Sequence, residues 1–466
     1  MPLYLENRLQ KAFNYFLERA KKNTFAKIGK EGWELSKDLA EEFTAEKKRK
    51  LEALDAWLSG YMRPIKLPDF FIETDNDLHF TDPFLPANRR HERRPEDVCN
   101  ILTTFMCYGC NIGPHIMPQI IPGITYWQIK HMFDWQFTDD AHRLGLATIV
   151  NGIAGIEITL AWGDGKTAAG DGQRFGYHRK SIYRTFSHKF NDFAIEFYIF
   201  VADNYAPFYN LAKETTDKDT FKVLDGYLYN VSDLDPDEWF FDTGGYTEIN
   251  FAAFAMLGKS FCPMIKNIKE QWIYKINAMK DYGSLNTLLK GANHTIKMSP
   301  IVDQWDRMAQ FYASLKAGNV TASTALKRLT GHTEKNDFYK ANRELGRVFK
   351  SEDIAYWMAD PAKRRRTRKG LLKTEQVHQL ARDITYGNRG RLKGRSLEEI
   401  NSSGNCTIII IACIIYWQAK EISRIVKEHN PEEASIDITL FTHISPIEWS
   451  NVILYGEYKL NRDLVK

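Results

Sequence analysis

A change of hydrophobic pattern near residue 160 constrains the fold of this chain more than any other feature. Before it, apolar residues recur at helical spacing, as Leu5, Leu9, Phe13 and Phe16 do. Between about residues 160 and 270, short runs rich in β-formers alternate with turns and one helix-like segment. This β–β–β–α–β order indicates a mixed sheet with helices. We therefore predict an α+β fold whose sheet region is flanked by helical sequence.

The sheet region itself contains several recognisable segments. Runs 193–200, 238–246 and 260–268 predict strands, and 249–258 predicts a helix that ends near its glycine. Residues 221–230 fit either a strand or the start of a helix. Residues 161–178 are rich in glycine and poor in large apolar side chains, and we expect a turn or loop there.

Helical sequence returns after residue 270. Residues 371–386 predict an amphipathic helix, and 397–426 predict a second, strongly apolar one. The apolar run 407–417 is far shorter than the ~20 residues that a membrane span needs, so we expect a buried element and no membrane partner. Proline residues near the start of 65–85 favour an extended linker.

Composition excludes some classes of protein. The 466 residues are 44% hydrophobic and 13% aromatic, which allows a large core and argues against general disorder. The six cysteines show no disulfide framework, and the N-terminus shows no signal peptide, so we expect a cytoplasmic protein. The net charge is only +4, but basic residues gather in separate clusters, namely 47–50, 89–94, 363–369 and 389–395. Such clusters are often solvated faces, yet several around one acidic site also suit nucleic acid.

Three acids from separate segments stand out. Asp171 lies between glycines in an expected turn, Asp242 follows an apolar strand, and Glu375 falls in the first turn of its expected helix. Each has an ordinary structural explanation as a turn, cap or helix-dipole residue. If the three converged, their oxygens would suit Mg²⁺, and two such ions could promote phosphoryl displacement. The nearby GDGKT at 163–167 lacks the spacing of a phosphate-binding loop.

Longer motifs resemble the Tn-three family of replicative transposases. They are WGDGKTAAGDGQRF (162–175), DTGGYTEINFAAFAMLG (242–258), ANRELGR (341–347), DPAKRRRTRKGLLKTE (360–375), YGNRGRL (386–392) and ISPIEWSNVILYGEY (444–458), with KLPDFFIETDNDLHFTDPF (66–84), ITYWQIKHMFDW (124–135) and YAPF (205–208). These segments occur in the family's order, from about residue 50 to the C-terminus. Members of the family are DDE-type enzymes about twice as long as this chain, and the resemblance covers their C-terminal half.

The resemblance implies a role for each acid. Asp171 occupies the first position, in an SDGQ-like motif whose serine is Gly170 here, and we prefer it to Asp164 because Gln173 follows. Asp242 occupies the second, and Glu375 the third, with Thr374 before it where the family usually has glycine. All three are implied as catalytic residues that ligate Mg²⁺ in a two-metal site, with Mn²⁺ as a possible substitute. The residues implied to position DNA are Gln173, Arg174, Arg364, Arg365, Arg366, Arg368, Arg389, Arg391, Lys393 and Arg395.

The same resemblance implies an RNase H-like core interrupted by a helical insertion. We expect a helical segment or linker at 1–64 and a helical scaffold at 65–155. The core would occupy 156–270 and 363–428, separated by the insertion at 271–362 and followed by a tail at 429–466.

The leading hypothesis is a DNA transposase region that produces 3′-OH ends and transfers them into target DNA. Its implied partners are transposon ends, target DNA and further transposase copies, in a homodimer or larger assembly near the bacterial nucleoid. The alternative is a truncated remnant that binds DNA or a full-length transposase without catalysing transposition. A third hypothesis is an unrelated helical structural protein. It requires all the ordered motifs to have arisen by chance.

Overall fold

The computed structural model describes residues 1–22, 25–29, 32–35, 44–86, 92–177, 185–187, 192–331, 336–394, 396–431, 434–447 and 450–466. The chain forms two compact units, each assembled from segments that are far apart in sequence. Unit 1 comprises Met1–Glu42, Lys218–Leu228 and Pro236–Leu371. Unit 2 comprises Phe43–Asp217, Tyr229–Asp235 and Leu372–Lys466.

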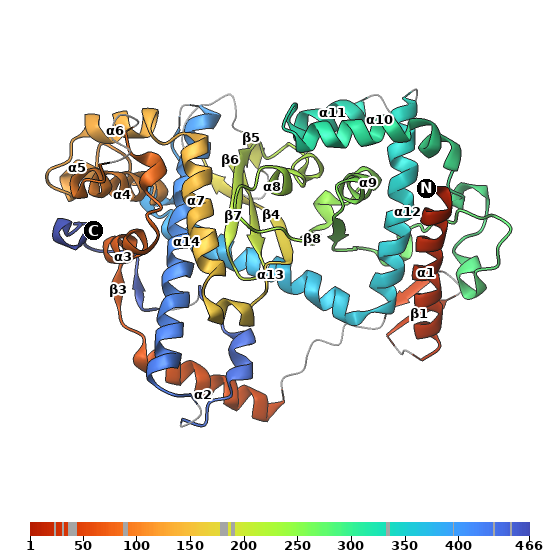
Figure 1. The fold of residues 1–466 in the computed structure, drawn as a ribbon, viewed down its shortest axis with the longest axis horizontal. Coiled ribbons are helices and arrows are strands. Elements are labelled where there is room, and N and C mark those ends of the chain that lie inside the picture. The colour runs from red at the N-terminus through yellow and green to blue at the C-terminus, as the bar shows by residue number, and fades with distance from the viewer. Residues whose placement is uncertain are drawn as a thin grey trace. The chain divides into compact units, whose positions relative to one another are not determined.

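Helix α12 (Asp337–Ala359) is the central helix of unit 1. It packs against α1 (Pro2–Ala20), α9 (Glu248–Met256) and α10 (Met298–Lys316), and Figure 1 shows α1 running alongside it. A Cβ atom at Gly346 would lie 3.0 Å from the Cα of Glu248 and closer still to its carbonyl group. Glycine at this position therefore allows α12 to approach the start of α9.

The core of unit 1 joins these helices. The apolar stripe of α1 is buried, and it includes Phe13 and Phe16 as the helical spacing predicts. Phe16 packs edge-on against the ring of Trp33, which is also buried, with 5.2 Å between their centroids. The N-terminal helix is thus part of this core.

Two parallel strands of unit 1 flank α9. Strand β8 (Glu238–Phe241) pairs with β9 (Ser260–Pro263), with Glu238 opposite Ser260. Thr247 caps the start of α9, and Gly258 follows its end with a φ of +76°. Glycine adopts this left-handed conformation without the steric cost of a Cβ. The predicted strands and helix in this region are confirmed.

The other elements of unit 1 are short, apart from α11. They are β1 (Ala26–Gly29), β2 (Gly32–Leu35), η4 (Asp219–Phe221), α8 (Asp225–Leu228), η5 (Thr243–Gly245), η6 (Ile268–Glu270), η7 (Gly283–Thr287), η8 (Ala292–His294) and α11 (Ala322–Gly331). The ambiguous segment 221–230 therefore contains a helical turn, α8.

Strand β6 (Asp192–Ala202) is the central strand of unit 2. It is antiparallel to β4 (Thr167–Gly176), β5 (Thr185–Ser187) and β7 (Pro207–Lys213). The side chains of Ile195, Phe197, Ile199 and Val201 are all buried, as are those of Tyr198 and Phe200 between them. Burial on both faces is consistent with the continuous apolar run that predicted this strand.

Helix α14 (Leu397–Glu428) is the apolar helix expected from the sequence. It packs on α7 (Asp139–Ala154), α4 (Pro95–Gly109) and β7, and Figure 1 shows α14 and α7 side by side. By length and composition alone α14 could cross a membrane, but 89% of its most apolar stretch is buried inside the structure. This burial is typical of the core helix of a folded domain.

Helical structure covers two segments in which the sequence pattern did not predict it. Helix α13 (Pro361–Ile384) includes the basic run that was expected to precede it. Helix α3 (Leu67–Leu78) occupies most of the expected linker, with Pro68 in its first turn. Proline is compatible with a first turn because its missing N–H would have no partner within the helix. The extended-linker interpretation was therefore wrong.

Shorter elements and connecting helices complete unit 2. They are α2 (Ala45–Tyr61), β3 (Ile65–Lys66), η1 (Asp82–Phe84), α5 (Met117–Ile120), α6 (Tyr126–Trp135), η3 (Glu157–Ala161), η9 (Gly387–Gly390), η10 (Ile438–His443), β10 (Val452–Ile453) and η11 (Arg462–Leu464).

Candidate metal-binding site

Asp171 lies in the middle of strand β4, opposite Ile199 of β6. The expected turn at this position was wrong, although the glycines that suggested it have a structural role. A Cβ at Gly172 would lie 3.0 Å from the Cδ of Glu196 and closer still to its Oε1. Glycine thus leaves room for the buried Glu196 carboxylate, which forms ion pairs with Arg174 at 2.7 Å and Lys213 at 2.6 Å. The Asp171 side chain remains 31% exposed.

Glu375 and His378 lie on helix α13, three residues apart. Side chains at this spacing share one face of a helix. Because α13 begins at Pro361, Glu375 is well inside the helix and not in its first turn. The expected interaction with the helix N-terminus therefore does not apply. The Glu375 side chain is 60% exposed, whereas the His378 ring is buried.

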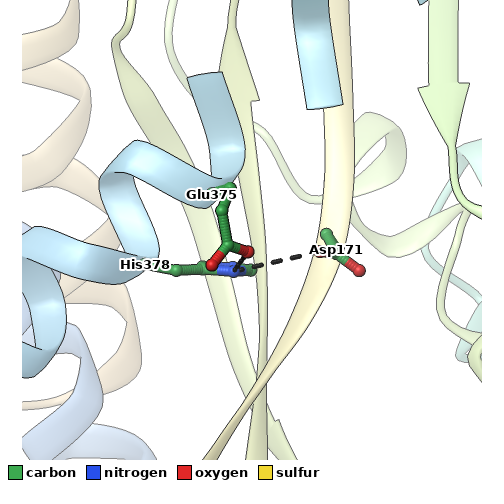
Figure 2. Close-up of side chains that lie close together, drawn as sticks. All are labelled: Asp171, Glu375 and His378. Atoms are coloured by element: carbon green, nitrogen blue, oxygen red, sulfur yellow. Dashed lines mark ion pairs between the residues drawn. The ribbon is translucent and has the colours of Figure 1, made fainter. Parts of the chain in front are cut away.

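These three side chains meet within unit 2. His378 Nδ1 lies 3.6 Å from Glu375 Oε2 and 3.9 Å from Asp171 Oδ2. Figure 2 shows dashed lines from the His378 ring to both carboxylates, one on the strand and one on the helix. One ligand atom from each residue lies within 4.8 Å of the others. Sequence reasoning missed His378, and the signal that could have found it was its position one turn after Glu375.

The Glu375 carboxylate is held in its ionised form. The neighbouring His378 ring, together with the guanidinium of Arg382, lowers the pKa of Glu375 to about 2. Arg382 Nη2 lies 3.3 Å from Glu375 Oε1, while His378 faces the other carboxylate oxygen. Glu375 is therefore a charged oxygen ligand at neutral pH.

Two contacts join α13 to the strands and loop beside it. Gln173 Nε2 donates a hydrogen bond of 2.6 Å to the backbone carbonyl of His378. Lys373 Nζ donates to the carbonyl oxygen of Trp162, at 2.8 Å, and to that of Asp203. Both side chains are buried, so their hydrogen bonds are part of the core of unit 2. They hold the segment that carries Asp171 against the helix that carries Glu375.

The glycine-rich loop before β4 is built around the chain's own carboxylate. Asp203 Oδ1 accepts from Gly165 N at 2.8 Å, and Oδ2 accepts from the N–H and hydroxyl of Thr167. The Asp203 carboxylate therefore occupies these donors of the loop. Its negative charge would also repel a phosphate group. Asp164 is exposed, accepts from Lys166 N at 3.1 Å and is outside the metal-ligand group.

Asp242 lies in unit 1, where it directly follows strand β8. Its side chain accepts a 2.7 Å hydrogen bond from Gly244 N and caps η5. The sequence-based placement at a strand end is confirmed, and the capping role exists as well. Its convergence with Asp171 and Glu375 stays a prediction.

The residues implied to contact DNA differ in accessibility. Gln173 is buried, and so is Arg364, whose Nη1 donates to the carbonyl of Trp357 at 3.0 Å. Arg174 is paired with Glu196, and Arg366 lies 3.4 Å from Glu238. Burial argues against direct contact of Gln173 and Arg364 with DNA.

The remaining implied DNA contacts are mostly at the surface. Arg365, Arg368, Arg389, Arg391 and Lys393 are exposed, and Arg395 lies outside the described residues. Asn388 and Arg389 have φ values of +53° and +59°, so the chain turns sharply there. This turn presents Arg389 and Arg391 at the surface of unit 2.

The side chains of the cluster fit a divalent cation. Asp171 and Glu375 provide accessible carboxylate oxygens, which are the ligands that Mg²⁺ prefers. Mg²⁺ usually binds through one or two carboxylates and keeps several water molecules. Two acids close together at a partly exposed position meet that requirement.

An acid on a strand and an acid on a helix thus lie close together in a mixed α/β unit, and the sequence match assigns the class of this domain. Residues 69–458 match the family model of the Tn3 transposase DDE domain, and the chain belongs to this family. The resemblance seen in the sequence motifs is therefore confirmed.

Curated relatives are transposases of bacterial transposons. The chain is 31% identical over 401 residues to the transposase for transposon Tn2501 of Escherichia coli, covering 86% of this chain and 40% of the relative. It is 28% identical over 432 residues to the transposase for transposon Tn1546 of Enterococcus faecium, and the match covers 92% of this chain and 42% of that relative. It is 28% identical over 468 residues to the transposase for transposon Tn501 of Pseudomonas aeruginosa, and the match covers 98% of this chain and 46% of that relative. The chain thus spans less than half the length of these relatives.

Proposed function

We propose that this chain is the catalytic region of a DNA transposase that cleaves DNA strands to 3′-OH ends and joins those ends to target DNA. The observation that supports this most directly is the meeting of Asp171 and Glu375 around His378. Membership of the DDE family makes a polynucleotidyl transferase the expected class of enzyme. The proposal includes an RNase H-like core at 156–270 and 363–428, interrupted by the helical insertion 271–362.

In this proposal Asp171, Asp242 and Glu375 together hold a pair of Mg²⁺ ions, which Mn²⁺ can replace. When bound, such ions activate a water or hydroxyl and stabilise the leaving oxygen of a phosphodiester. Asp171, on a paired strand, and Glu375, held by His378 and Arg382, supply rigid charged oxygens. Rigid placement matters because a shift of about 1 Å can cost ~100-fold in rate.

The exposed cations of this chain would bind the DNA backbone. Arg365 and Arg368 lie on α13, and Arg389, Arg391 and Lys393 lie in the basic turn that follows this helix. Cations of this kind bind phosphates and position the duplex without reading its sequence. The partners in this proposal are transposon ends, target DNA and further transposase copies, acting in the bacterial cytoplasm near the nucleoid.

A cleavage assay tests the proposal. The chain is incubated with Mg²⁺ and a supercoiled plasmid that carries the inverted repeats of a Tn3-family element, and nicked products and their 3′ ends are mapped. We expect 3′-OH ends from wild type, a loss of at least ~100-fold in Asp171→Asn, Asp242→Asn and Glu375→Gln, and normal activity in Asp164→Asn. Asp164 is a suitable control because it is exposed and lies outside the cluster.

Three other results would contradict the proposal. Equal activity in Asp242→Asn and wild type would remove Asp242 from the site. Loss of activity in Asp164→Asn with Asp171→Asn unaffected would reverse the choice of first acid. DNA binding without cleavage by any form would favour the non-catalytic alternative, in which the chain binds DNA or a full-length transposase.

A further inference from the structure

His378 has two nitrogens in very different surroundings. Nδ1 faces the carboxylates of Glu375 and Asp171 at 3.6 and 3.9 Å. Nε2 is buried and has no hydrogen-bond partner among the residues that the structure describes. The position of the ring proton therefore decides what this side chain can do at the site.

If His378 were a metal ligand, Nδ1 would offer its lone pair and the proton would lie on Nε2. That arrangement buries an N–H without a partner, which is rare in folded proteins. Metal-bound histidines almost always donate their second N–H to a carboxylate, carbonyl or water. No such acceptor for Nε2 exists among the described residues.

The other tautomer fits the surroundings better. With the proton on Nδ1, the ring directs an N–H toward two anionic acceptors, which is the favourable electrostatic arrangement. The distance of 3.6 Å to Glu375 is longer than a formed hydrogen bond. Contacts at such sites are often long before ligands bind and shorten afterwards.

The residues around the ring also suit a positioning role. Arg382 lies against Oε1 of Glu375, so His378 and Arg382 hold the carboxylate from its two oxygens. The backbone of His378 is itself fastened by Gln173 at 2.6 Å. The ring therefore has a defined position from which to direct Nδ1 at both acids.

We propose that His378 is a positioning residue that donates its Nδ1–H to the Glu375 and Asp171 carboxylates and does not itself bind the metal. Its importance for DNA cleavage rests on the proposed function above. Its importance for the geometry of the acidic pair does not, because that can be measured by metal binding alone.

Mn²⁺ alone, added to the chain, is the first probe. Pulsed electron paramagnetic resonance detects the ¹⁴N coupling of an imidazole that is coordinated to Mn²⁺. We expect Mn²⁺ to bind without a coordinated-nitrogen signal. A coordinated ¹⁴N signal that disappears in His378→Asn would overturn the proposal.

Calorimetric Mn²⁺ titration of two variants supplies the second test. The amide N–H of Asn can occupy the place of Nδ1–H, whereas Leu fills the space without a donor. We expect His378→Leu to weaken Mn²⁺ binding by about 10-fold or more, as loss of residues that orient metal ligands typically does. His378→Asn should stay within about threefold of wild type. Equal binding by His378→Leu and wild type would overturn the positioning role.

Two controls separate this proposal from others. His131→Asn changes an exposed histidine of α6 and should leave Mn²⁺ binding unchanged. Asp171→Asn should weaken Mn²⁺ binding both in the wild-type chain and when it is combined with either His378 variant. If wild type binds Mn²⁺ with these properties but cleaves no DNA, the proposed function fails while the positioning role of His378 stands. Circular dichroism melting of each variant shows whether the fold is retained.

Discussion

Gln173 of strand β4 donates a 2.6 Å hydrogen bond to the backbone carbonyl of His378 on helix α13. The two residues are far apart in sequence, and each lies close to an acid of the candidate site. Gln173 is two positions from Asp171, and His378 is one helical turn from Glu375. This buried contact therefore helps Lys373 to hold the strand that carries one acid against the helix that carries the other.

Removal of this contact should loosen the acidic pair. We expect Gln173→Leu to lower the free energy of unfolding by about 1–2 kcal/mol, because a hydrogen bond is lost within a buried site. Mn²⁺ affinity should fall as well, since the two carboxylates lose their common support. Urea denaturation and calorimetric Mn²⁺ titration measure the two effects, with exposed Gln119→Leu as the control. Unchanged Mn²⁺ affinity in Gln173→Leu would show that other contacts position the pair.

Replacement of Gly172 by a residue with even the smallest side chain should destabilise the fold. A Cβ there would approach the buried Glu196 carboxylate, which Arg174 and Lys213 bind. We expect Gly172→Ala to destabilise the fold by about 1–3 kcal/mol through overpacking. Gly60→Ala is a matched control, because it is exposed in α2 with open space around it. That change should be neutral or slightly stabilising by helix propensity. Similar melting temperatures for wild type and Gly172→Ala would contradict this view of the strand.

Asp225 should make the stability of the chain depend on pH. Burial raises the pKa of its carboxyl to about 7, from an ordinary value of 3.8. Its raised pKa means that the folded state holds the proton more tightly than the unfolded state does. The resulting stabilisation is complete below about pH 4 and is lost as pH rises toward and through 7.

Asp225→Asn tests this dependence. The variant carries no ionisable group there, so it should be more stable than wild type at pH 8 by about 2 kcal/mol or more, with a much smaller difference near pH 4. Denaturant titrations at several pH values measure this, and exposed Asp55→Asn in α2 serves as the control. A difference that does not vary with pH would contradict burial of an ionisable Asp225.

Neighbouring arginines of α13 should have different roles. Arg365 is exposed, whereas Arg364 is buried with its guanidinium bonded to a backbone carbonyl and over the ring of Phe25. We expect Arg365→Ala to weaken DNA binding and to lower the slope of log affinity against log salt by about 1, without loss of stability. Arg364→Ala should instead lower stability by about 2 kcal/mol or more. Fluorescence anisotropy at several salt concentrations and thermal melting distinguish the two. Unchanged DNA affinity in Arg365→Ala would remove this residue from the DNA surface.

Periodicity in the sequence predicted the elements that depend on local pattern. The apolar stripe of α1, strand β6 and the order β8, α9, β9 follow from apolar spacing and from the glycine after α9. Local pattern predicted a turn or loop where β4 lies, because glycines near Asp171 are typical of turns. Pairing with β6 and the space required by Glu196 explain those glycines, and neither is visible in the local sequence. Local pattern also placed the start of α13 too late. The basic run was expected to precede this helix, but it belongs to it, and Lys and Arg are good helix formers.

The sequence by itself determined the family and singled out Asp171, Asp242 and Glu375 as candidate site residues, because ordered motifs carry that information without coordinates. Only the tertiary structure decided that one histidine nitrogen faces both Asp171 and Glu375 and that Gln173 holds the backbone of that histidine. It also decided which arginines are accessible. The physical reason is that strand pairing and helix packing place residues some 200 positions apart in the chain within a few ångströms (Gln173 and His378 are separated by 205). Spacing along the chain cannot specify such distances.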